Sequence, residues 1–495
     1  MNMQSSTDHA TYEERASYQN TGLILGPVIF AVMMLAGNFQ TAMDPIAWKT
    51  AAAGLLMATW WATEALPVPV TAFLPIVLFA PLGIANLQDS AAPYANPIIY
   101  LYLGGFMLAL AVEKWNLHRR IALLILSHTG TDGRRLIGGF MLTSALLSMW
   151  MTNTSTTMML LPIALSVIGV ITENVPNLDK KNRDNFQTAM LLGLAFSATI
   201  GGLATLVGTP PNALLIGFLN ESYDLDISFA RWMLIGVPVS AVMLPIAWLT
   251  LTRFVFPVDI QESDEVKSHL GKMHAEIGPM TKAERRVAVI FSCVIALWML
   301  RRPLSEAFNI SGLSDPGIVM AAAVLLFLIP SGSNKTPQLM SWHDANRLPW
   351  GVLVLFGGGL SLAAAVSASG LAAWLGASLA IFGAFGVTML VLAAVIMVIF
   401  LTELTSNLAT TATFLPVMGA IALEAGVPPL VLLVPVTLAA SCAFMLPVAT
   451  PPNAIVFASG MIKIPQMIRA GLVLNLAGAI VLALISLFWA PVVLQ

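Results

Sequence analysis

Apolar runs separated by short polar stretches follow one another along nearly the whole chain. A helix needs roughly 20 apolar residues to cross the hydrocarbon core of a bilayer, and runs of this kind recur from residue 22 to the C-terminus. The pattern therefore predicts an all-α polytopic membrane protein with about 11 transmembrane helices. Examples of these runs are residues 22–36, 97–113, 187–207, 229–252, 287–300, 315–329, 371–401 and 466–490.

The longest polar stretch, residues 257–286, separates two halves of the chain that resemble each other. "NTSTTMMLLPI" at 153–163 aligns with "NLATTATFLPV" at 407–417, and "TPPNA" at 209–213 recurs unchanged at 450–454. A glycine-bearing apolar segment precedes each copy, "YLGGFMLALAV" in the first half and "LFGGGLSLAAAV" in the second. Three matching pairs in the same order indicate an internal duplication, which is typical of transporters that bind their solute between two repeats.

The duplication divides the chain into four predicted parts. They are a polar N-terminal segment (1–21), a first half (22–256) with the Asn153 motif and a TPPN break at 209–212, a polar connecting segment (257–286), and a second half (287–495) with the Asn407 motif and a TPPN break at 450–453. The N-terminal segment has neither the basic region nor the cleavage site of a signal peptide, so residues 22–36 are expected to remain as a helix.

Each TPPN sequence predicts a helix that breaks inside the membrane. Two consecutive prolines cannot continue a helix, because proline lacks the N–H group and clashes with the preceding turn. The apolar segments that follow, "ALLIGFL" and "AIVFASGM", are too short to cross a bilayer. Backbone groups freed at this depth need a cavity, an ion or a solute as partner, since lipid cannot satisfy them.

The hydroxyl and amide side chains at 152–157 lie beside one of these breaks. Neutral oxygens suit a hard cation such as sodium, and helix N-termini carry partial positive charge that favours an anion. Ser and Thr also join membrane helices through hydrogen bonds worth about 0.6 kcal/mol each. That simpler interpretation fits a single Thr well, but it explains duplicated Asn motifs beside duplicated breaks poorly.

Composition narrows the class of protein. Hydrophobic residues make up 58% of the chain and charged residues 10%, and the net charge is −2, so a nucleic-acid partner is excluded. The six histidines lie outside the motifs, so a membrane-embedded enzyme would lack a base or metal ligands there, and the protein is expected not to be an enzyme. A channel would place its filter on a symmetry axis and would not need oxygen clusters beside broken helices.

Three carboxylates, Glu64, Glu113 and Glu403, lie in or at the ends of apolar runs. Ionisable groups at membrane depth are costly, and a role as proton relay would account for them. The alternative is that they accept hydrogen bonds from free N–H groups at helix breaks, and Glu113, next to Lys114, is expected at a water interface. Proton coupling therefore stays open as an alternative to sodium coupling.

The motifs together resemble the divalent anion/sodium symporters, a family that carries dicarboxylates, citrate or sulfate. "ASCAFMLPVATPPNAIVF" at 440–457 is similar to the family's long signature, and "WWATEALPVPVTAFLPIVLFAPLGI" at 60–84 looks like its early segment. The resemblance implies two re-entrant hairpins in two inverted repeats, a homodimer, and elevator-type motion of a transport domain. It also implies co-transported sodium, a small anionic substrate, most simply succinate, malate or fumarate, and a bacterial inner membrane as location. Proton-coupled or exchange transport of citrate or sulfate is the alternative.

The resemblance also assigns roles by position, with Asn153 and Asn407 shared between substrate and sodium. The substrate-binding residues that it implies are Thr152, Asn153, Thr154, Ser406, Asn407, Leu408, Thr450 and Pro451. The sodium ligands that it implies are Ser148, Thr152, Asn153, Gly201 and Gly202 for one site, and Thr402, Thr405, Asn407 and Ala449 for the other. Leu408 departs from the family, whose usual Thr donates a hydrogen bond there, so selectivity is expected to differ. Exchangers of the family place a fixed positive side chain near these loops, but neither motif contains Lys or Arg.

Overall fold

The computed structural model describes residues 16–41, 43–174, 179–310, 312–333, 336–379 and 386–494. Most of the polar N-terminal segment therefore lies outside the described residues. Within them the chain is helical, with one isolated bridge between Pro330 and Gln338 and no β-strand. The predicted all-α class is confirmed.

The helices of the first half follow the apolar runs of the sequence. They are α1 (Ser17–Ala36), α2 (Pro45–Thr63), α3 (Val68–Thr71), α4 (Leu74–Leu82), α5 (Leu87–Ala91), η1 (Ala92–Ala95), α6 (Pro97–Lys114), α7 (Leu117–His128), α8 (Gly133–Ser148), α9 (Asn153–Asn174), α10 (Lys180–Gly202), α11 (Pro210–Tyr223), α12 (Phe229–Leu249) and η2 (Thr250–Val255).

The remaining helices begin within the polar connecting segment and run to the end of the chain. They are α13 (Asp264–Ile277), α14 (Lys282–Phe308), α15 (Asp315–Leu328), α16 (Trp342–Ala345), α17 (Trp350–Ala368), α18 (Leu371–Leu379), α19 (Val387–Thr402), α20 (Asn407–Glu424), α21 (Leu430–Ala440), α22 (Pro451–Phe457), α23 (Ile464–Leu484), η4 (Ile485–Trp489) and α24 (Ala490–Leu494).

Seven helices of the described chain are long and apolar enough to cross a membrane. Shorter apolar helices of 10–17 residues accompany them, at Val68–Leu82, Asp315–Leu328, Val387–Thr402 and Leu430–Ala440. The apolar run 371–401 holds two helices, α18 and α19, and is not one continuous span. Gly386 precedes α19 with φ +81°, a backbone conformation that residues with a Cβ rarely adopt.

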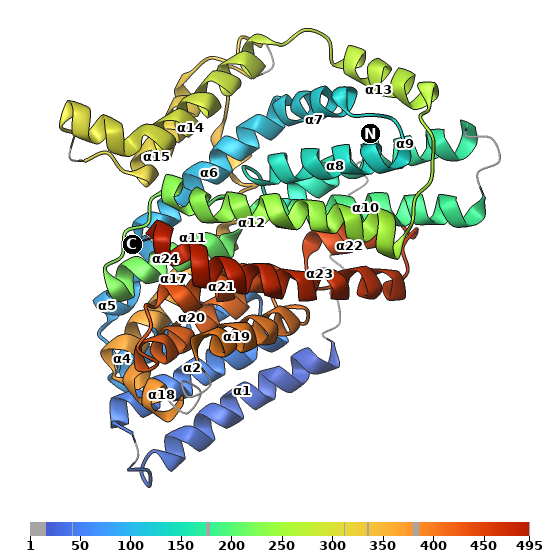
Figure 1. The fold of residues 1–495 in the computed structure, drawn as a ribbon. Helices are drawn as coiled ribbons and strands as arrows, with labels where there is room; N and C mark the ends of the chain where they lie inside the picture. The colour runs from blue at the N-terminus through green and yellow to red at the C-terminus, as the bar shows by residue number, and fades with distance from the viewer. Residues whose placement is uncertain are drawn as a thin grey trace, which may run out of the picture.

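Two helix–turn–helix hairpins, α8–α9 and α19–α20, have their tips at the predicted Asn motifs. Figure 1 shows α1 and α2 at one edge of the molecule and α14 and α15 at the opposite edge, with α9, α10, α12 and α23 between them. The glycine-bearing segments permit close packing of α6 on α15 and of α17 on Ala72, which follows α3. A Cβ on Gly104 of α6 would lie 2.7 Å from Val319 Cγ1 of α15, and one on Gly358 of α17 would lie 2.4 Å from Ala72 O.

Ion pairs collect where segments 113–120, 262–286 and 330–347 meet at one end of the helices. Lys114 Nζ lies 2.7 Å from Asp344 Oδ2, and Arg347 pairs with Glu113. The opposite end carries a smaller group in which Arg301 Nε lies 3.2 Å from Asp315 Oδ1. The polar groups thus mark two separate ends of the apolar body.

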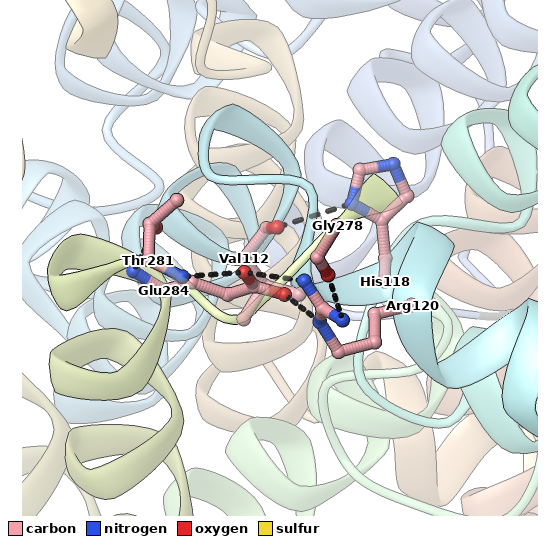
Figure 2. A network of polar contacts seen from close by, with 6 residues as sticks. All are labelled: Val112, His118, Arg120, Gly278, Thr281 and Glu284. Atoms are coloured by element: carbon pink, nitrogen blue, oxygen red, sulfur yellow. Dashed lines mark hydrogen bonds and ion pairs between the residues drawn. The ribbon is translucent and has the colours of Figure 1, made fainter. Parts of the chain in front are cut away.

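Figure 2 shows a largely buried ion pair between Arg120 on α7 and Glu284 in the first turn of α14. Arg120 Nη2 donates to Glu284 Oε2 at 3.1 Å, and its Nη1 donates to the Gly278 carbonyl at 3.0 Å. The backbone N–H of Glu284 in turn donates to the Thr281 hydroxyl oxygen, which caps α14, at 3.1 Å. Helix α7 follows α6 and leads into hairpin α8–α9, so this contact fixes the helix that connects them.

Candidate functional site

The tips of the two hairpins have the same hydrogen-bond pattern. Ser148 Oγ donates to Asn153 Oδ1 at 2.6 Å in the first, and Thr402 Oγ1 donates to Asn407 Oδ1 at 2.9 Å in the second. One turn further on, the hydroxyl groups of Thr157 and Thr411 donate to the carbonyls of these two asparagines, each at 2.8 Å. The sequence duplication is therefore also a duplication of side-chain geometry.

The structure contains both predicted helix breaks, one in each half of the chain. Helix α10 ends at Gly202 and α11 begins at Pro210, while α21 ends at Ala440 and α22 begins at Pro451. Each Pro-Pro pair occupies the first two helical positions, where the missing N–H groups have no intrahelical partner to lose. The prolines that end one helix segment are thus well suited to start the next.

Asn212 and Asn453 hold the two connecting loops in shape. Asn212 Nδ2 donates to the carbonyls of Gly202 at 3.2 Å and Thr205 at 2.8 Å. Asn453 Nδ2 donates to the equivalent carbonyls of Ala443 at 3.2 Å and Leu446 at 3.0 Å. Both asparagines are fully buried. Each TPPN sequence therefore both breaks its helix and satisfies the loop that the break creates.

Oxygen atoms cluster behind each hairpin tip. A Cβ placed on Gly202 would lie 2.6 Å from Asn153 Oδ1 and 3.2 Å from the Gly208 carbonyl, so the loop backbone closely approaches the first tip. At the second tip Thr402 Oγ1 also lies 2.7 Å from the Ala440 carbonyl oxygen, which competes with Asn407 Oδ1 for its single proton. Thr405 turns away from Asn407, because its hydroxyl contacts Leu401 O at 3.0 Å and Thr410 Oγ1 at 2.6 Å.

A cavity of about 850 Å³ lies in front of both tips. It is lined by segments of both hairpins, by the starts of α11 and α22, by residues of α3, α6 and α17, and by Glu64, which follows α2. All eight residues that the sequence assigned to substrate line this cavity: Thr152, Asn153, Thr154, Ser406, Asn407, Leu408, Thr450 and Pro451. Of the residues assigned to sodium, Thr152, Asn153, Asn407 and Ala449 also line it, whereas Ser148, Gly201, Gly202, Thr402 and Thr405 do not.

Four helices begin at the cavity wall, and none of their first turns contains a basic side chain. These helices are α9, α11, α20 and α22. Each helix start carries about half a unit of positive charge from its aligned peptide dipoles, and proteins use such ends to bind anions. The wall opposite is largely apolar, with Val68, Phe106, Val352 and Leu355 among its residues.

Arg347 is a lining residue that the sequence motifs did not reveal. Among the described residues it is the one Lys or Arg that lines the cavity, and it forms an ion pair with Glu113, which lines the cavity as well. Gly208 is another lining residue that was missed, and it occupies in the first repeat the place of Ala449 in the second. The repeat offset between Asn212 and Asn453 would have identified Gly208, but no local pattern pointed to Arg347.

The three carboxylates in apolar runs have three different surroundings. Glu403 is 3% exposed and accepts hydrogen bonds from backbone N–H groups at the second helix break. Glu64 is exposed, in the left-handed conformation that ends α2, so it is not a buried carboxylate as the apolar run suggested. Glu113 pairs with Arg347 at the cavity margin. The hydrogen-bond acceptor role is thus observed for Glu403 alone.

Comparison with known proteins gives consistent matches over nearly the whole chain. The model of the family described as sodium:sulfate symporter transmembrane region matches residues 17–495. The sodium-dependent dicarboxylate transporter SdcS of Staphylococcus saprophyticus is 40% identical over 489 residues, which cover 97% of this chain and 94% of the relative. A protein of the same name from Staphylococcus aureus is 40% identical over 483 residues, covering 96% and 92%.

One solved structure supports the fold. The Alcanivorax borkumensis YdaH transporter, described as having an unusual topology, matches with a TM-score of 0.54 over 96% of this chain and 99% of that one. The sequence identity is 15%, so this likeness concerns the fold alone.

Proposed function

The chain belongs to the sodium:sulfate symporter family, and from this membership we propose that it carries a four-carbon dicarboxylate, such as succinate, malate or fumarate, together with sodium across the bacterial plasma membrane. The observation that carries the proposal is the convergence of both Asn motifs and four helix starts on one cavity. The names of the 40% identical relatives support the dicarboxylate and the sodium.

A dianion in this cavity needs more positive charge than the helix starts supply. Helix dipoles provide partial charges only, and an unpaired charge taken out of water is costly. Arg347, which lines the cavity, is already paired with Glu113. Sodium ions bound behind the two tips would provide the remaining charge, and would leave together with the substrate.

The proposed sodium sites use the clusters around Ser148 and Asn153 and around Thr402 and Asn407. Hydroxyl, amide and carbonyl oxygens are the ligands that hard cations prefer. In the first site the backbone of Gly201 and Gly202 contributes, and Gly208 is added to the residues assigned from the sequence. In the second site the Ala449 backbone contributes, while the hydroxyl of Thr405 is engaged elsewhere.

The basic residues suggest which side of the membrane the cavity faces. Lys114, Arg120 and Arg347 belong to the end where Glu113 lines the cavity. An excess of Lys and Arg marks cytoplasmic loops, so we assign this end to the cytoplasm and the structure to the inward-facing state. Elevator motion of the hairpins within a homodimer would then carry the substrate between the two faces.

Exchange of a related anion such as citrate or sulfate is the second candidate function, and Arg347 is the observation that favours it. A fixed cation at the cavity could replace a transported one if Glu113 released it. Proton coupling is less favoured, because the hydrogen bonds that the buried Glu403 makes within the described chain all come from N–H donors, an arrangement that suits an ionised carboxylate.

Uptake of labelled succinate into proteoliposomes tests the proposal. We expect accumulation driven by an inward sodium gradient and none when potassium replaces sodium at fixed pH. Uptake that follows a proton gradient, or that needs a preloaded anion, would favour the alternatives, and no uptake in any condition would reject the dicarboxylate.

Asn153→Ala and Asn407→Ala should each reduce sodium-driven uptake by roughly tenfold to a hundredfold, because a hydrogen bond to a charged group is worth about 1.5–3 kcal/mol. Asn220→Ala is the matched control, since Asn220 is exposed near the end of α11 and does not line the cavity. Wild-type uptake by either motif variant would refute the site assignment.

A further inference from the structure

Glu403 is a buried carboxylate to which the transport mechanism proposed above assigns no role. It lies directly after Thr402, at the tip of hairpin α19–α20. Its Oε1 accepts from Phe444 N at 2.8 Å, and its Oε2 accepts from Leu446 N at 3.1 Å, while Met445 N lies within 3.1 Å of both oxygens. Asn475 Nδ2 on α23 donates to Oε1 at 2.7 Å. Every partner is an N–H donor, as an ionised carboxylate requires.

The first repeat has no counterpart to this charge. The offset that aligns Asn153 with Asn407 places Met149 opposite Glu403. There, the loop after α10 is held to the hairpin tip by a hydrogen bond from the Thr205 hydroxyl to the Met149 carbonyl. In the first repeat, a hydrogen bond between two neutral groups therefore joins the loop to the hairpin tip. In the second repeat, the Glu403 carboxylate and its four donors make this connection.

The packing helices repeat the same asymmetry. A Cβ on Gly236 of α12 would lie 2.4 Å from Leu203 O, and one on Gly471 of α23 would lie 2.3 Å from the equivalent carbonyl, Phe444 O. This match makes Ser240 the counterpart of Asn475. Ser240 Oγ donates to Ile200 O at 2.7 Å, so its hydroxyl bonds a helix carbonyl and takes no part in holding a carboxylate.

Glu403 joins the two parts of the chain that form the second oxygen cluster. One part is the hairpin tip, where Thr402 contacts both Asn407 Oδ1 and Ala440 O. The other is the loop 441–450, whose amides Glu403 binds and whose end contains Ala449. Charge-assisted hydrogen bonds are about twice as strong as neutral ones, and a nearby negative charge attracts a cation more strongly in a desolvated setting.

We propose that Glu403 is a positioning residue of the second sodium site, which holds loop 441–450 against the hairpin tip and makes this site the tighter of the two. The inference rests on the proposed sodium coupling and deepens it. The two sodium sites are then unequal despite the repeat symmetry, and the site at Thr402 and Asn407 fills at lower sodium concentration than the site at Ser148 and Asn153.

Sodium titration of succinate uptake tests this with Glu403→Gln, which keeps the shape of the side chain and removes its charge. We expect the sodium concentration for half-maximal uptake to rise about tenfold, while the succinate KM at saturating sodium stays within a factor of two. Ser240→Ala is the matched control on the equivalent packing helix, and its sodium curve should be unchanged. An unchanged sodium curve in Glu403→Gln, or an equal shift in the sodium and succinate curves, would overturn the proposal.

A second variant, Asn475→Leu, tests the same proposal if Glu403→Gln does not fold. This variant retains the charge and removes one of its donors, so the half-maximal sodium concentration should rise about twofold to threefold. A folded Asn475→Leu protein with the wild-type sodium curve would overturn the proposal in that case. Failure of sodium coupling itself is distinguishable, because wild-type protein would then take up succinate without sodium.

Discussion

At the residue scale, Leu408 breaks the symmetry of the cavity. Leu408 and Thr154 are equivalent in the two repeats, each following the motif asparagine, and both line the cavity. Leu408 is largely buried but lines the cavity, where it places methyl groups at the position at which its counterpart carries a hydroxyl. A site with unequal walls favours a ligand whose two ends receive different numbers of hydrogen bonds.

Leu408→Thr should therefore change the ranking of transported anions. A hydroxyl at this place can donate to an additional oxygen, so we expect uptake of citrate or sulfate relative to succinate to increase by roughly threefold to tenfold. Competition against labelled succinate measures the ranking. Leu408→Val is the control, because Val has the shape of Thr without the hydroxyl. Equal rankings in the Thr and Val variants would assign the effect to side-chain volume.

The hydroxyl and amide residues of the cavity could be predicted because they lie in short duplicated motifs. All eight residues assigned to substrate line one cavity, although whether they bind it stays a prediction. Arg347 could not be predicted, because its place depends on a contact with Glu113 across 234 positions of the chain. Neither residue lies in a motif, and only the folded arrangement brings them together.

At the element scale, the helix breaks follow from proline chemistry and were visible in the sequence. Both TPPN sequences start new helices, at Pro210 and Pro451. The division of run 371–401 into α18 and α19 was not visible, because both helices are apolar throughout. The positive φ of Gly386 before α19 leaves no mark in the hydrophobic pattern either.

The close approach of a broken helix to a hairpin tip leads to a prediction for Gly202→Ala. Its new Cβ would lie 2.6 Å from Asn153 Oδ1, well inside contact distance, so the side chain of Asn153 must move. We expect sodium-driven uptake to fall at least about tenfold, the cost of one displaced ligand. Gly169→Ala in α9 is the control, since its Cβ would meet nothing within 4 Å. Unaltered sodium dependence in Gly202→Ala would place Asn153 Oδ1 outside the sodium site.

At the scale of the whole molecule, the elevator proposal requires some helices to stay fixed while the hairpins move. Helix α7 connects α6 to hairpin α8–α9, and Figure 2 shows it tied to the start of α14 through Arg120 and Glu284. The hydrogen bonds that Arg120 donates to Glu284 raise the pKa of Arg120, so the guanidinium stays charged at every working pH. Held in this way, α7 would stay fixed while the hairpin that follows it moves.

Two variants distinguish a role of this ion pair in fixing α7 from a role in stabilising the fold. They are the single variant Arg120→Met and the double variant Arg120→Met with Glu284→Met. The single change leaves Glu284, whose side chain is 4% exposed, without its partner. It should cost about 3 kcal/mol and lower the Tm, because an uncompensated charge stays buried. The double change removes both charges and should restore the Tm, since apolar replacement of a buried pair is often neutral. If the ion pair keeps α7 fixed during transport, the maximal uptake rate of the double variant stays severalfold below wild type, with unchanged KM for sodium and succinate. A double variant with the wild-type rate would show that the ion pair stabilises the fold without guiding the motion.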